Sequence, residues 1–264
     1  MKTKFKSLSL IAITFLLFAL PFSSSAASFA LYLCGGATAG LIPDAAVNAT
    51  LKSGDKIMWQ EFDAAGNTPI GSPSTVTVAT DGTPLPFTVG TGLSVGAHYF
   101  KVFIIAVNPN NCSGDLSDPF SLYVLPTAAV TLGTPSQTSF CEANSNPTVQ
   151  NSVITATATA LDAVLTDVTY EFTWTATKDA GAVTDVTTIG TIGAVNPVNV
   201  NSFTLNNTAG HGAYIFKAAV KYVVAPGNGV LKSPSDLGCP AESAASTTIT
   251  VTPKPGKPSI QIAP

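Results

Sequence analysis

The stretch Gly96–Val102 reads GAHYFKV, and it recurs as GAYIFKA at Gly212–Ala218. A tryptophan precedes the phenylalanine of each copy, by 41 residues in the first and 42 in the second. Such self-similarity is typical of a chain built from copies of one structural unit. We therefore expect the aromatic residues of the repeat to lie in the cores of two related units. These predicted core residues are Trp59, Phe100, Trp174 and Phe216.

Cysteines and prolines mark the ends of the two copies. One cysteine opens each copy, a second closes it, and a proline follows the closing cysteine by fourteen residues in both cases. In chain order these residues are Cys34, Cys112 and Pro126, then Cys141, Cys239 and Pro253. We therefore divide the chain into unit 1, residues 28–126, and unit 2, residues 127–253, and we call residues 254–264 the tail.

Both units have the pattern of β structure. In Tyr170–Trp174, which reads YEFTW, aromatic side chains alternate with Glu and Thr, so they share one face of a strand. The other candidate strands are short, rich in Val, Thr and Ile, and bounded by turn residues. About seven short strands per 100 residues, with one Trp and two Cys per unit, predict an all-β chain of two tandem immunoglobulin-like β-sandwiches. The main predicted strands are Lys56–Phe62, Ser74–Ala79, His98–Val107, Val153–Ala160, Val168–Ala176 and Ala213–Val224.

Residues 1–27 have the features of a cleaved signal peptide. Three lysines precede an apolar run, Leu8–Leu20, and the small residues Ser23–Ala27 follow it. The run is too short to span a bilayer comfortably, and no later apolar stretch approaches the length of a membrane helix. We therefore expect a secreted protein, located at the cell surface, with no membrane span in its mature form.

Composition argues against several classes of function. Only 10% of the residues are charged, the net charge is −3, and none of the twelve cationic side chains is an arginine. Because arginine is the main bidentate reader of phosphate and guanine, we expect no nucleic-acid partner. The chain has two histidines and none of the common catalytic or metal-binding motifs. We therefore predict no catalytic residue, no bound metal and no cofactor.

The four cysteines of an exported chain predict two disulfides. A zinc site is disfavoured because the chain contains no C-x-x-C motif and only two histidines. Three pairings of four cysteines exist, and the sequence leaves all three open. Pairing within each unit would tie the first edge region of that unit to the loop before its last strand.

The combination of these features resembles a known repeat class. An opening Cys, a central Trp, a Gly-x-Tyr-x-Phe stretch, and a second Cys before a final Thr/Val strand resemble the Ig-like or PKD-like domains of secreted and surface proteins of Bacteroidetes-type bacteria. The segments Asn108–Ser113 (NPNNCS) and Gly238–Pro240 (GCP) carry this resemblance. The resemblance implies the fold more specifically than the function, because such domains serve as spacers, adhesins and glycan binders alike.

The ends of the two copies do not match. Unit 2 has a long lead-in before Cys141, with a strand-like segment at Ala129–Gly133, and unit 1 has no equivalent. The tail resembles this lead-in, as a proline-rich link followed by alternating apolar residues. A free strand can fill an unpaired sheet edge of another molecule. We therefore predict a donor strand formed by Pro258, Ser259, Ile260, Gln261 and Ile262, and an acceptor edge at Phe29, Leu31 and Leu33.

Two alternatives remain for these segments. Ser28–Leu33 has its own alternation and is a candidate first strand of unit 1, and the tail is a candidate linker. On the sequence, the favoured function is a non-catalytic structural or adhesive protein, whose partner is a further copy of itself in a head-to-tail homopolymer or another cell-surface protein or glycan. The competing hypothesis is a monomeric module that binds glycans or proteins.

Overall fold

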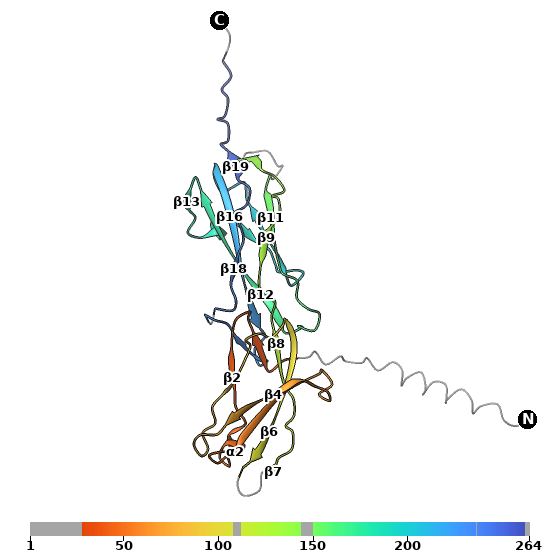
Figure 1. Ribbon diagram of the computed structural model, residues 1–264. Helices are drawn as coiled ribbons and strands as arrows, with labels where there is room; N and C mark the ends of the chain where they lie inside the picture. The colour runs from red at the N-terminus through yellow and green to blue at the C-terminus, as the bar shows by residue number, and fades with distance from the viewer. Residues whose placement is uncertain (1–27, 108–111, 144–149, 236, 262–264) are drawn as a thin grey trace, which may run out of the picture.

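The computed structural model describes residues 28–107, 112–143, 150–235 and 237–261. The predicted signal peptide, residues 1–27, lies outside these ranges. The described residues form an elongated molecule that is almost entirely β structure, with unit 2 and unit 1 at opposite ends (Figure 1). No helix within the described ranges is long and apolar enough to cross a membrane.

Unit 1 consists of one large sheet faced by a small one. Its elements are β1 (Leu31–Leu33), β2 (Ala39–Leu41), α2 (Ala45–Asn48), β3 (Lys56–Phe62), β4 (Pro69–Thr77), β5 (Phe87–Val89), β6 (Gly96–Ala106), β7 (Cys112–Ser113) and β8 (Phe120–Val124). The large sheet has the order β1-β8-β6-β3-β4, with β7 also paired to β6. The small sheet contains β2 and β5.

Unit 2 has two larger sheets, and one of its strands leaves to join unit 1. Its elements are β9 (Val130–Leu132), β10 (Ser139–Cys141), β11 (Ser152–Ala158), β12 (Val168–Lys178), β13 (Gly181–Ala182), the 3-10 helix η1 (Val186–Thr188), β14 (Gly190–Ile192), β15 (Val200–Leu205), β16 (Gly212–Val224), β17 (Val230–Lys232), β18 (Ala241–Glu242) and β19 (Ile249–Thr252). One sheet has the order β10-β19-β16-β12-β13, with β18 also on β16, and the other β14-β15-β11-β9. Strand β17 extends the large sheet of unit 1 beside β1.

The strands repeat as the sequence does. In each unit a three-residue strand at the opening cysteine runs parallel to the last strand, β1 on β8 and β10 on β19. The long central strands β6 and β16 carry the two copies of the sequence repeat, and each pairs with the strand that contains the tryptophan. The predicted strand Lys56–Phe62 coincides with β3, and the predicted segment Ala129–Gly133 contains β9.

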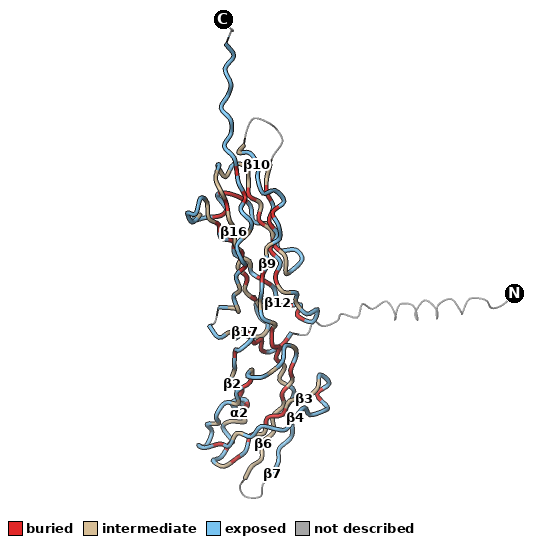
Figure 2. Tube along the Cα trace, turned by 45° about the horizontal axis from the view of Figure 1, so that its top comes forward, coloured by how far each residue is buried: buried red, intermediate tan, exposed pale blue. Residues whose placement is uncertain are grey.

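Each unit has its own hydrophobic core between its sheets (Figure 2). The four repeat aromatics, Trp59, Phe100, Trp174 and Phe216, are all 5% exposed or less. Trp59 stacks on Phe87, and the indole Nε1 of Trp174 donates a hydrogen bond of 2.7 Å to Asn201 Oδ1. Both tryptophans are therefore held among core side chains.

Strand β1 joins the two units. Its backbone pairs in parallel with β8 on one side and with β17 on the other. Because successive side chains of a strand point to opposite faces, Leu31 and Leu33 pack into the core of unit 1, whereas Tyr32 packs into the core of unit 2.

The disulfide pattern differs from pairing within units. Cys34, the residue after β1, is bonded to Cys239 of unit 2, and Cys112 and Cys141 carry no disulfide. Two disulfides were predicted, and the structure has one. The reason is the position of β17: it lies beside β1 and brings the following loop, with Cys239, against Cys34 at a Cα–Cα distance of 5.8 Å.

We expect the Cys34–Cys239 disulfide to contribute strongly to stability. It closes a loop across a sequence separation of 205 residues, and the chain-entropy model gives up to about 5 kcal/mol for a loop of that size. Replacing both cysteines, C34S/C239S, is expected to lower the urea midpoint of unfolding markedly. A change below about 0.5 kcal/mol would show that the strand pairing alone fixes the junction.

Candidate functional site

Among the described residues, unit 1 has no counterpart of β9, the edge strand of the four-stranded sheet of unit 2. In unit 2, β9 pairs antiparallel with β11, which also pairs with β15. The counterpart of β11 in unit 1 is β2, which pairs with β5 and, within the described residues, with no other strand. One edge of β2 is therefore open at the position that β9 occupies in unit 2. Such an edge is a template for pairing with another chain.

Side-chain exposure along the central strands shows the same difference. In unit 2 the core-facing residues Ala218, Val220 and Tyr222 of β16 are at most 2% exposed. Their repeat counterparts on β6 include Val102 and Ile104, which are only partly buried. In unit 2, β9 packs against β16, and side chains of unit 1 pack against the C-terminal end of β16. The corresponding part of β6 has no such cover among the described residues.

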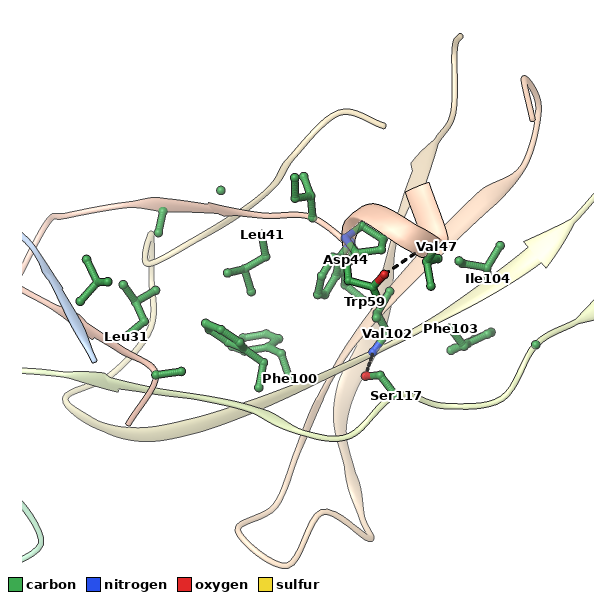
Figure 3. A pocket seen from close by; sticks show the side chains of 18 of the residues that line it. Leu31, Leu41, Asp44, Val47, Trp59, Phe100, Val102, Phe103, Ile104 and Ser117 are labelled. Carbon is green, nitrogen blue, oxygen red and sulfur yellow. Dashed lines mark hydrogen bonds between the residues drawn. The ribbon is translucent and has the colours of Figure 1, made fainter. Parts of the chain in front are cut away.

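A cavity of about 760 Å³ lies along this uncovered part of unit 1 (Figure 3). Strand β2 and the segment that leads to α2 form one wall, and residues of β6 and the following loop form another. Leu31 of β1 and Val230 of β17 close one end. The side chains that face the cavity are predominantly apolar, and they include Leu31, Leu41, Val47, Trp59, Phe100, Val102 and Ile104.

Of the four Asp, Ser and Lys side chains that line the cavity, two take part in local structure. Asp44 caps α2, where its Oδ1 accepts a hydrogen bond of 2.9 Å from the backbone N–H of Val47. Ser117 Oγ accepts one of 3.0 Å from the backbone N–H of Val102. The cavity therefore offers largely apolar walls and the backbone edge of β2, the two features that a β-strand with alternating apolar residues requires.

The structure places the predicted acceptor residues elsewhere. Phe29 is buried against Tyr32 and Tyr123, and Leu31 and Leu33 belong to β1, which has a partner strand on each side. An incoming strand therefore finds no open backbone there, and the prediction of an acceptor edge at Phe29, Leu31 and Leu33 is wrong. Ser28–Leu33 instead contributes a strand of unit 1, and the open position is at β2.

The tail extends away from unit 2 (Figure 1). Residues 252–261 are exposed throughout, and the side chain of Ile260 is 100% exposed. Of the predicted donor strand, Pro258, Ser259, Ile260 and Gln261 are described, and Ile262 lies outside the described residues. Burial of an isoleucine side chain that is otherwise fully exposed contributes about 1.5–3 kcal/mol of favourable free energy.

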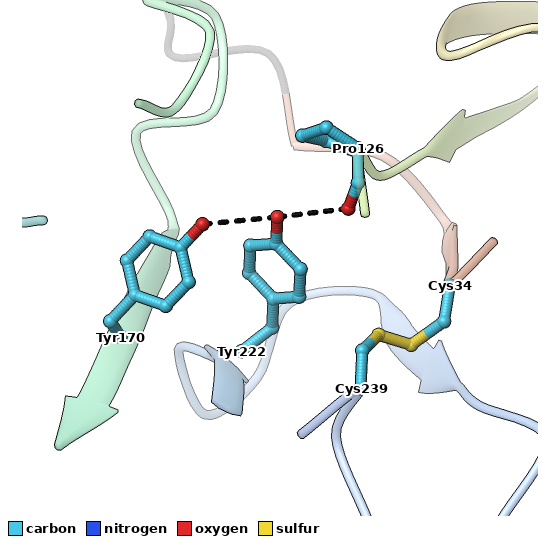
Figure 4. Close-up of a disulfide and its surroundings, with 5 residues drawn as sticks. All are labelled: Cys34, Pro126, Tyr170, Tyr222 and Cys239. Carbon is cyan, nitrogen blue, oxygen red and sulfur yellow. Dashed lines mark hydrogen bonds between the residues drawn. A yellow bond between two sulfur atoms is a disulfide. The ribbon is translucent and has the colours of Figure 1, made fainter. Parts of the chain in front are cut away.

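The junction between the units is held by buried tyrosines as well as by the disulfide (Figure 4). Tyr32 donates a hydrogen bond to the Asp167 carboxylate, at 2.6–2.7 Å from its two oxygens. The hydroxyl of Tyr222 lies 3.0 Å from the carbonyl oxygen of Pro126 and 3.0 Å from the hydroxyl of Tyr170. These bonds fix unit 2 on the end of unit 1.

Burial sets the ionisation of these tyrosines. Burial, together with the hydrogen bond to Asp167, raises the pKa of Tyr32 to about 12. Burial and the bond with Asp162 likewise raise the pKa of Tyr123 to about 12, and burial also raises the pKa of Tyr222. The junction therefore favours neutral tyrosines, because a phenolate there would lose hydration and face a carboxylate.

The remaining titratable candidates are dispersed. His98 is buried at the start of β6, with Nδ1 at 2.7 Å from Glu61 and Nε2 at 2.8 Å from the Ser94 carbonyl oxygen. His211 is exposed in unit 2, with Nδ1 at 3.8 Å from Glu142. In the described part of the chain, no three His, Cys, Asp or Glu side chains gather as a metal site would require.

Comparisons with known proteins add little. No protein-family model matches the chain, and no curated protein matches it. Among solved structures it is similar to extracellular domains 3–5 of Drosophila OTK, at 9% identity and a TM-score of 0.25, over 78% of this chain and 95% of that chain. A TM-score this low does not indicate a shared fold.

We expect Tyr32→Phe to destabilise the protein by about 1–3 kcal/mol, because it leaves the buried Asp167 carboxylate without its donor. Since the folded-state pKa of Tyr32 lies above the ordinary value of about 10, its contribution is complete below pH 10 and is lost as the pH rises towards 12. Urea unfolding at several pH values measures both effects. Tyr99→Phe, in a half-buried tyrosine of unit 1, is the control; an equal loss in both variants would contradict the prediction.

Proposed function

We propose that the protein is a non-catalytic extracellular subunit, structural or adhesive, made of two immunoglobulin-like units. Copies polymerise head-to-tail when the tail of one inserts at the open edge of β2 in unit 1 of the next. The observation that carries this proposal is the absence, among the described residues, of a counterpart of β9 beside β2, at the site of an apolar cavity.

The tail has the sequence pattern of β9, whose counterpart is absent from the described part of unit 1. Residues 260–264 read IQIAP, and residues 130–135, which contain β9, read VTLGTP. In β9 the first apolar residue, Val130, is buried, and the following Thr131 is exposed. By the same alternation, Ile260 and Ile262 of an inserted tail face the cavity, and Gln261 faces solvent.

The tail is also long enough. Five residues separate β8 from β9, and this link brings β9 onto the sheet of unit 2. Seven residues separate β19 from Ile260. An extended residue spans up to about 3.3–3.6 Å, so the tail link has at least the reach of the link inside the chain. A contact between different surfaces of successive copies gives an open, linear assembly.

Three further observations support this proposal, and the first of them favours it over a monomeric binding module. Glycan recognition would favour exposed aromatic platforms, but the large hydrophobic side chains that are exposed in the described part of the chain are all aliphatic. The disulfide is characteristic of oxidising compartments, which supports an extracellular location. The repeated strand order supports the immunoglobulin-like assignment of both units.

Filament formation depends on the tail in this proposal. We expect negative-stain electron microscopy of the exported protein to show thin unbranched filaments, and deletion of residues 254–264 to abolish them. Ile260→Asp places a charge against the apolar cavity and should reduce filament length by at least tenfold. Lys257→Ser, outside the donor strand, is the control. Filaments from the deleted chain, or none from the intact chain, would overturn the proposal.

The acceptor site has its own test. A peptide of residues 253–264 is expected to bind the chain that lacks residues 254–264. Ile42→Lys should weaken this binding by tenfold or more, because Ile42 lines the cavity at the end of β2. Ile70→Lys is a matched control: Ile42 and Ile70 are 53% and 50% exposed, and Ile70 lies on β4, away from this cavity. Equal affinities of the two variants, measured by fluorescence anisotropy, would place the acceptor elsewhere.

A further inference from the structure

The two cysteines without a disulfide are the repeat counterparts of the two that are bonded. Cys34 and Cys141 open units 1 and 2, and Cys112 and Cys239 close them. The bond joins the opening cysteine of unit 1 to the closing cysteine of unit 2. The opening cysteine of unit 2, Cys141, and the closing cysteine of unit 1, Cys112, form no disulfide, and both are exposed.

The opening cysteines have the same position in the fold. Leu33 of β1 lies opposite Val124, so Cys34 comes level with Leu125, the residue before Pro126. Cys141 of β10 lies opposite Thr252, the residue before Pro253. Each opening cysteine therefore stands at the end of its unit from which the chain continues, beside the strand that leads into the next segment.

The closing cysteines also correspond. Cys112 lies in β7, which pairs back onto β6, and Cys239 lies two residues before β18, which pairs back onto β16. Both cysteines follow the C-terminal end of the long central strand of their unit. In the molecule, β7 lies at the free end of unit 1, and β10 with Cys141 lies at the opposite end, beside the start of the tail (Figures 1 and 2).

We propose that Cys141 of one copy forms a disulfide with Cys112 of the next copy, repeating between molecules the bond that joins Cys34 to Cys239 within one. This inference rests on the head-to-tail assembly proposed above. Insertion of the tail at β2 brings the end of unit 2 that carries β10 against the end of unit 1 that carries β7 in the next copy. The same relation between consecutive units then holds along the whole filament, with a covalent bond at each junction.

The intermolecular junction lacks two features of the internal one: the repeat counterpart of Tyr222 on β6 is Ala106, and the loop before Cys112 is shorter. Fourteen residues separate β16 from Cys239, and they include β17; only five separate β6 from Cys112. The shorter loop has no room for a strand equivalent to β17 as well as its connections. The junction between copies therefore depends on the inserted tail and on the disulfide, without the additional strand that supports the junction inside the chain.

The bond requires an oxidant. Two thiols lose two protons and two electrons when they form a disulfide, and a disulfide-bearing oxidant accepts them. The Cys141 thiolate attacks the oxidant and releases one of its sulfurs as a thiol. The Cys112 thiolate of the next copy then attacks the Cys141 sulfur and releases the second. In the test the oxidant is glutathione disulfide; in the cell we assign this role to the disulfide oxidants of the export compartment.

The test uses full-length exported protein, assembled with glutathione disulfide, quenched with N-ethylmaleimide and separated without reductant. We expect a ladder of covalent multimers, and a peptide that joins Cys112 to Cys141 by mass spectrometry. C112S and C141S alone should each run as monomers. Mixed together, they should give dimers and nothing longer, because each mixed pair holds one Cys141 and one Cys112. Dithiothreitol should collapse every multimer to the monomer.

The outcomes separate this inference from the proposed function. Filaments in the microscope without a covalent ladder, or with both thiols alkylated, overturn the disulfide and leave the head-to-tail assembly standing. Covalent dimers from C141S alone would show Cys112 bonded to Cys112 and would also overturn the inference. Absence of filaments from the intact chain overturns the proposed function, and the intermolecular disulfide with it.

Discussion

Strand β1 has a partner on both of its edges, and the geometry of the rest of the molecule depends on this. Pairing with β8 fixes Leu31 and Leu33 in the core of unit 1, and pairing with β17 brings a loop of unit 2 to the same sheet. The intervening side chain, Tyr32, points into the core of unit 2 and binds Asp167. Three residues thus contribute to two cores, and the disulfide at Cys34 locks the arrangement.

The open edge of β2 acquires its meaning from comparison with unit 2. In both units the long central strand pairs with the strand that contains the tryptophan, and a short parallel strand pairs with the last strand. Comparison of the units therefore shows which strand of unit 2 has no counterpart in the described part of unit 1. Unit 2 obtains its β9 from the residues that link it to unit 1. In unit 1, no strand of the described residues lies beside β2 at the equivalent position. The proposed assembly supplies this strand from another copy, and each unit then receives its strand from the segment that precedes it in the filament.

Much of the fold was predictable from the sequence because its signals are local. Alternation in Tyr170–Trp174 and the strand-like composition of Lys56–Phe62 each depend on residues within one element, and both strands are found. The mismatch between the lead-in of unit 2 and the start of unit 1 was also visible, because it concerns residue order alone. The disulfide pairing was not, since it depends on β17, a short strand that crosses to the other unit.

The sequence by itself determined that this is an all-β chain with an internal repeat, and it indicated that the tail shares an apolar strand pattern with the lead-in of unit 2. Periodicity and repeats record these properties directly. Only the tertiary structure decided which edge is open and which cysteines meet. The physical reason is that strand neighbours are set by backbone hydrogen bonds between distant segments, and backbone groups are the same in every residue except proline. Hence Leu31–Leu33 and Ala39–Leu41 both form three-residue strands, but of these two only the second has, within the described residues, an edge left to pair.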